Sequence, residues 1–173
     1  MLKRETWHQS ASELDAICKR FRDAHWGVHG QGWPRHSKDE QVMIETSVEG
    51  IKILRSLALA VRTEQDFGLI PADENVVGAF KNQDAVPSDA VEAKKRGGYQ
   101  QLLDENQYSS LQLRDGLNVI AHMDPTRSDY HVGPNESAHD LLLFGMNRGK
   151  QWFAVVSIFE VIRVIHSLPD VNL

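Results

Sequence analysis

The chain has few of the features that mark secreted or membrane proteins. It contains a single cysteine, Cys18, among 173 residues, so no disulfide can form within one chain. Its first residues lack the apolar run of a signal peptide, and no apolar stretch approaches the roughly 20 residues that cross a bilayer. We therefore expect a cytoplasmic protein in which Cys18 is a buried thiol on an amphipathic helix.

Several signatures of enzyme families are also missing. The sequence has no GxSxG elbow, no CxxC pair and no glycine-rich dinucleotide fingerprint. Residues 145–150 lack the spacing of a phosphate-binding loop and are expected to form a hairpin turn that exposes Arg148 and Lys150 to RNA or an acidic partner. The net charge of −5 disfavours a basic surface that coats nucleic acid, although a small site needs only one or two cations.

The composition is that of an ordinary globular domain. Hydrophobic residues make up 41% of the chain and charged residues 25%. The length suits one domain with a core that needs neither disulfides nor metals. We therefore expect residues 1–173 to form a single domain.

Apolar residues recur mostly at helical spacing. The pattern predicts four helices, which span residues 4–28 (or 12–28), 37–67, 99–123 and 152–167. A small β-hairpin, residues 139–144 and 150–153, is expected between the third and fourth helices. Residues 69–98 form an irregular connection, with short helices at 73–80 and 88–95. The predicted fold is mainly α, a four-helix bundle with an inserted hairpin.

Three polar residues on the predicted third helix form a candidate catalytic site. Arg114, Asn118 and His122 are each four residues apart, and each such step turns a helix by about 40° and rises about 6 Å. The three therefore share one stripe. Histidine can transfer a proton near neutral pH, arginine can stabilise phosphate charge, and asparagine can orient either group.

This inventory suits a metal-independent ribonuclease. Arg114 and His122 lie about 12 Å apart along the axis, so a two-fold homodimer would help by presenting two stripes to each other. A hydrogen-bond network between helices fits the same spacing, and both interpretations stay open.

Residues 113–124, LRDGLNVIAHMD, resemble the motif helix of HEPN (higher eukaryote and prokaryote nucleotide-binding) proteins, especially those of bacterial defence and toxin systems. The usual motif joins an arginine, a polar residue and a histidine in a phrase such as LRNKxxAHxD. Such proteins are helical bundles, usually dimeric, and many are metal-independent ribonucleases. The resemblance implies a HEPN-like bundle that forms a homodimer, needs no cofactor, and cleaves or binds RNA in bacterial stress or phage defence.

The resemblance also assigns roles to individual residues. Arg114 would be the cation beside the phosphate, Asn118 or Asp115 the polar helper, and His122 the catalytic histidine. This chain departs from the usual pattern in two ways. Seven residues separate Arg114 from His122, and Gly116 and Leu117 stand where an arginine is expected.

Two alternatives remain. The first is a non-catalytic partner of an immunity or antitoxin type, because the negative charge suits a basic protein and residues 69–98 offer a surface. The second is a metal site at His25 and His29, which have a helical ligand spacing and precede His36. A third ligand would come from Glu40 or from His122, although no HExxH pattern is present.

Overall fold

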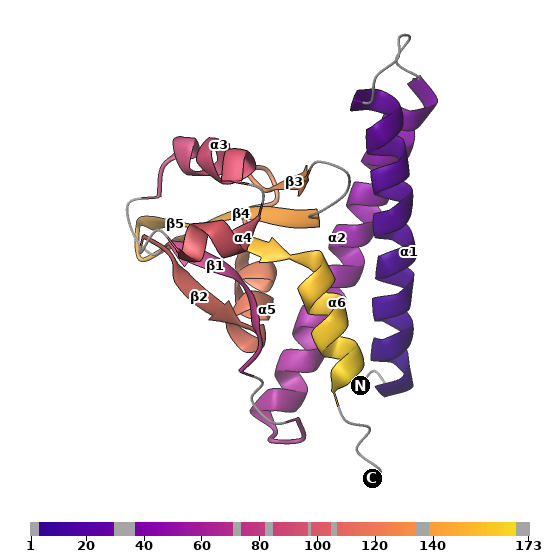
Figure 1. Cartoon of the computed structure of the whole chain (residues 1–173). Helices are drawn as coiled ribbons and strands as arrows, with labels where there is room; N and C mark the ends of the chain where they lie inside the picture. Colours follow the sequence, from indigo (N-terminus) through magenta and orange to yellow (C-terminus); the bar gives the residue numbers. More distant parts are fainter. Residues whose placement is uncertain are drawn as a thin grey trace.

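The computed structural model describes residues 4–29, 37–70, 74–81, 85–96, 98–104, 107–133 and 139–168. These ranges contain six helices and five strands (Figure 1). In chain order they are α1 (Arg4–His29), α2 (Ser37–Asp66), β1 (Val76–Lys81), α3 (Pro87–Arg96), α4 (Tyr99–Leu103), β2 (Ser109–Gln112), α5 (Leu113–His122), β3 (Asp129–Val132), β4 (His139–Asn147), β5 (Lys150–Ser157) and α6 (Ile158–Ser167).

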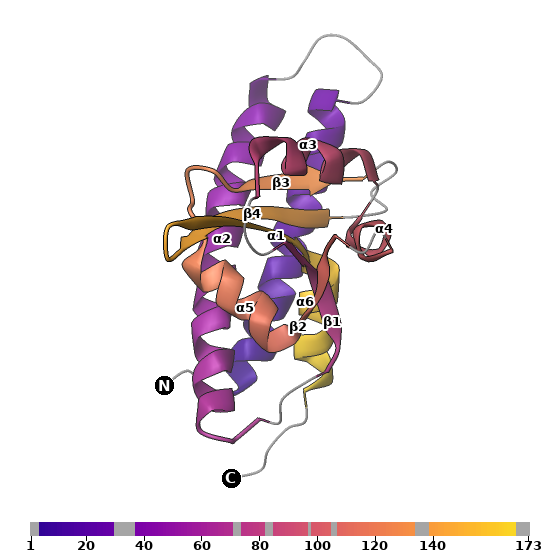
Figure 2. The same ribbon diagram turned by 90° about the vertical axis from the view of Figure 1, so that its left-hand side faces the viewer.

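The prediction of a mainly α, four-helix HEPN-like bundle with a small hairpin is wrong. The predicted hairpin, β4 and β5, lies inside a five-stranded antiparallel sheet with the order β2-β1-β5-β4-β3. Helices cover both faces of this sheet, so its inner strands are apolar on both sides (Figures 1 and 2). A strand buried on both faces lacks the alternating pattern that marks a half-exposed strand.

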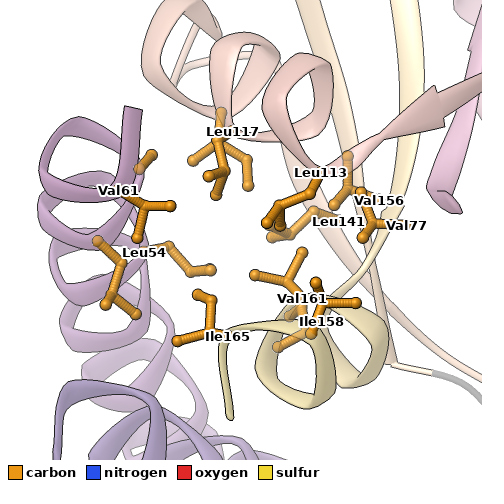
Figure 3. Close-up of a cluster of buried hydrophobic side chains, with 14 of the residues drawn as sticks. Leu54, Val61, Val77, Leu113, Leu117, Leu141, Val156, Ile158, Val161 and Ile165 are labelled. Carbon is orange, nitrogen blue, oxygen red and sulfur yellow. The ribbon is translucent and has the colours of Figure 1, made fainter. Parts of the chain in front are cut away.

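The larger core lies between one face of the sheet and four helices. Helices α1 and α2 pack along each other, and α5 and α6 fill the space between this pair and the sheet (Figure 2). Figure 3 shows Leu54 of α2, Leu117 of α5 and Ile165 of α6 meeting in this core. A smaller core on the opposite face joins Leu142 and Phe153 of the sheet to α3 and α4.

Two predicted helices contain strands. Residues 99–123 divide into α4, β2 and α5, and Leu111 is the one buried residue of β2, which pairs with β1. Residues 152–157 belong to β5, and α6 begins only at Ile158. There the hydroxyl of Ser157 accepts a hydrogen bond from the backbone N–H of Glu160 at 3.3 Å, a helix-capping arrangement.

Other expectations are confirmed in part. The first two helices appear as α1 and α2, and Cys18 is buried, which raises the pKa of its thiol to about 12. Within residues 69–98, α3 matches the short helix at 88–95, but β1 replaces the helix expected at 73–80. The described part of this segment is therefore built into the fold, and the protein-binding alternative stays a prediction. No helix in the described ranges is long and apolar enough to span a bilayer.

Two neighbouring residues of β4 bury ionisable side chains in the core. His139 is 0% exposed and Asp140 is 2% exposed. Burial, with Arg22, His25 and His131 nearby, lowers the pKa of His139 to about 3, and burial raises the pKa of Asp140 to about 7. The two groups therefore give the free energy of unfolding opposite pH dependences.

The direction of each pH dependence follows from comparing the pKa of the group in the folded protein with its pKa in the unfolded chain. His139 binds a proton near pH 6.5 when unfolded and near 3 when folded, so its contribution falls as pH drops between these values. Asp140 loses its proton near pH 3.8 when unfolded and near 7 when folded, so its contribution falls as pH rises between these values.

We predict that Asp140→Asn gains stability relative to the wild type as pH rises from 3.8 to about 7. The variant lacks the carboxyl group whose ionisation inside the core is unfavourable, at about 1.4 kcal/mol for each pKa unit. Urea unfolding of both proteins across this pH range measures the difference. A difference that stays constant with pH would contradict the assignment.

Candidate functional site

The helix that carries the candidate residues lies closely against β1. Leu113 donates its backbone N–H to the carbonyl oxygen of Asn75 at 3.1 Å, which anchors the first turn of α5. A Cβ added at Gly116 would lie 2.5 Å from Cγ2 of Val77, so any larger side chain would push the helix away from the sheet. Packing against β1 thus accounts for a glycine where the HEPN-like pattern has a larger residue.

The structure separates the three residues that the sequence had grouped. Arg114, Asn118 and His122 are all exposed on α5, as the four-residue spacing predicts. Arg114, however, forms an ion pair with Asp66 at the end of α2. Asn118 and His122 instead line a pocket that does not include Arg114.

This pocket opens between α5 and the β4–β5 hairpin and has a volume of about 570 Å³. Its lining combines aromatic and apolar side chains with three polar ones. The lining residues are Phe80 of β1, Asn118, Val119 and His122 of α5, Met146 and Asn147 of β4, and Trp152 of β5. The rings of Phe80 and Trp152 have centroids 6.0 Å apart and form an aromatic floor.

Trp152 owes its position to a glycine on the neighbouring strand. Gly145 pairs with Trp152 in the β4–β5 register, and an added Cβ at Gly145 would lie 1.9 Å from Cζ2 of the indole. The absence of a side chain therefore lets the indole lie across β4. The sequence predicts Gly145 in the turn between the expected strands 139–144 and 150–153, so its pairing with Trp152 was not predicted.

Four hydrogen-bonding side chains at the pocket have no partner among the described residues. They are the amides of Asn118 and Asn147, the imidazole of His122 and the indole N–H of Trp152. Asp124, two residues beyond His122, is occupied elsewhere. The hydroxyl and backbone N–H of Thr126 donate to its carboxylate and hold its pKa below the usual value. The pocket is therefore lined with hydrogen-bonding side chains that no other described residue engages.

The alternative metal site is incomplete in the described residues. The rings of His25 and His29 on α1 have centroids 4.5 Å apart, and burial together with the charges of His29 and His131 lowers the pKa of His25. No group of three or more histidine, cysteine, aspartate or glutamate side chains within the described ranges could hold a metal ion. His36 lies outside those ranges.

Comparison with protein-family models, curated proteins and solved structures finds no match to this chain. The HEPN-like resemblance and the homodimer that it implies therefore stay predictions, and the site is interpreted from its own residues.

We predict that Gly145→Ala lowers the free energy of unfolding by about 1–3 kcal/mol, the usual range for overpacking. The added methyl group would displace the indole of Trp152 or move β4. Urea unfolding of a double-mutant cycle with Trp152→Leu tests the cause, because most of the cost should disappear when the indole is absent. An equal cost in both backgrounds would show that the glycine is required for another reason.

Proposed function

We propose that the pocket between α5 and the β4–β5 hairpin binds an unpaired base of RNA. The observation that carries this proposal is the set of four unpartnered polar groups around the rings of Phe80 and Trp152. A nucleobase has a flat face for aromatic contact and an edge that both donates and accepts hydrogen bonds. Its chemistry matches this lining.

The charge of the lining favours a neutral group over a phosphate or a carboxylate. Neither lysine nor arginine lines the described pocket, and Arg114 is engaged with Asp66. Asn118, Asn147 and the indole N–H are uncharged, so His122 is the lining residue that can carry a charge. A volume of about 570 Å³ falls within the roughly 300–1,000 Å³ of small-ligand pockets and is ample for a base.

An unpaired strand, and RNA in particular, is favoured as the source of the base for three reasons. Bases in a duplex are stacked and paired, whereas unpaired bases can enter a pocket and contact aromatic rings, at about 1–3 kcal/mol each. A net charge of −5 disfavours tight binding along a duplex, but a pocket for one base does not need a basic surface. The resemblance of residues 113–124 to the motif helix of RNA-acting proteins supports the same choice.

Binding is the activity that the site supports best. The ribonuclease hypothesis placed Arg114 beside the phosphate and His122 at the reacting proton, but Arg114 pairs with Asp66 and does not line the pocket that His122 lines. His122 and Asn118 are thus proposed as contacts of the base, and RNA cleavage is a separate readout of the same experiment.

We predict that His122→Ala and Asn118→Ala each weaken binding of a short unstructured RNA about two- to twelvefold. Each variant removes a hydrogen bond worth roughly 0.5–1.5 kcal/mol. Fluorescence anisotropy with labelled RNA in EDTA measures the affinity, and gel analysis of the same samples reports cleavage. Circular dichroism first establishes that every variant is folded.

Two control variants make the comparison specific. His166→Ala removes an exposed histidine from the last turn of α6, as His122→Ala does from the last turn of α5, and should bind like the wild type. Arg114→Ala should also retain binding, because its side chain does not line the pocket. The proposal is wrong if the wild type does not bind RNA, or if His122→Ala and Asn118→Ala bind as tightly as His166→Ala.

A further inference from the structure

The turn that joins β4 and β5 has a residue that is unusual for its conformation. Asn147 pairs with Lys150 in the strand register, so Arg148 and Gly149 form a two-residue turn. Their φ angles are 49° and 78°, both in the left-handed region. Such turns favour Asn, Asp or Gly at the first position, where an arginine costs about 1–2 kcal/mol.

The turn holds this arginine beside the pocket. Asn147, the residue before Arg148, lines the pocket together with His122. Figure 2 shows the β4–β5 turn next to the end of α5 that carries His122. Arg148 is exposed, and it makes no ion pair with another described residue, unlike Arg114 and Arg163.

We infer that Arg148 binds the phosphate attached to the nucleotide whose base occupies the pocket. This inference rests on the proposed function and extends it from a base to a nucleotide unit of an RNA strand. Neither lysine nor arginine lines the described pocket and the protein is acidic overall, so a cation at the rim would favour binding of a phosphate there. A guanidinium supplies several N–H donors in a plane that matches two phosphate oxygens.

The arrangement also explains why the less favourable residue occupies the turn. Asparagine before Gly149 would fit the left-handed backbone better but would remove the charge. Arg148 thus exchanges some hairpin stability for a contact with the ligand. A substitution at this position can therefore move stability and phosphate binding in opposite directions.

Arg148→Asn provides the test, with Arg148→Lys as the variant that retains a positive charge and Arg163→Ala as a control for loss of an exposed arginine. Calorimetric titrations compare a nucleoside with its 5′- and 3′-monophosphates. We expect at least one monophosphate to bind the wild type more tightly than the nucleoside, by about tenfold or more for one charge-assisted contact. Arg148→Asn should lose this advantage, bind the nucleoside normally and unfold at a higher urea concentration, and Arg148→Lys should retain part of the advantage.

Short RNA gives an independent readout. The slope of the logarithm of the binding constant against the logarithm of salt concentration should decrease by about 0.7 in Arg148→Asn, the value for one phosphate contact on a single strand. The inference is overturned if Arg148→Asn weakens nucleoside and monophosphate equally, or leaves the monophosphate advantage and the salt slope unchanged. It also falls if Arg163→Ala has the same effect.

Failure of the inference can be distinguished from failure of the proposed function. If the wild type binds nucleoside and RNA but Arg148→Asn changes neither the monophosphate advantage nor the salt slope, the base pocket is supported and only the phosphate contact is refuted. If the wild type binds neither nucleoside nor RNA, both the proposed base pocket and the phosphate contact are refuted. RNA that binds no more tightly than the monophosphate identifies a free nucleotide as the ligand.

Discussion

The burial of the β4–β5 hairpin on both faces is the constraint on which the rest of the structure depends. Leu141 and Leu143 of β4 face the larger core, whereas Leu142 and Phe144 face the smaller one. A strand with two apolar faces needs a cover on each side. Helices α1, α2, α5 and α6 supply one cover and α3 and α4 the other, and the position of α5 over the hairpin creates the pocket.

The sequence predicted the elements whose apolar spacing or turn residues lie within the element itself. The long helices α1 and α2 follow from apolar spacing, and the β4–β5 strands follow from the turn between them. Strand β1 could not be found in this way, because its state depends on pairing with β2 and β5, which are distant in sequence. The close approach of Gly78, whose added Cβ would lie 2.2 Å from the Val155 carbonyl oxygen, becomes informative only after that pairing is known. The start of α6 was within reach, since Ser157 and Glu160 have the spacing of a helix cap.

The same distinction applies to the candidate site. Asn118 and His122 were predicted because one helix carries them, but the pairing of Arg114 with Asp66 involves a helix 48 residues earlier and left no sequence signal. Phe80, Asn147 and Trp152 join the site through sheet register alone. The helical motif thus included two of the four polar groups at the pocket, Asn118 and His122, and neither of its aromatic rings.

The most direct test of the central claim is to observe the pocket side chains while RNA is added. Nuclear magnetic resonance can follow the indole N–H signal of Trp152, assigned with Trp152→Phe, and the imidazole signals of His122, assigned with His122→Ala. Titration with a short unpaired RNA should shift both sets of signals with a single affinity and leave the indole signal of Trp7, buried in the larger core, unchanged. Signals of Trp152 and His122 that stay fixed while RNA binds, or the absence of any binding, would contradict the account.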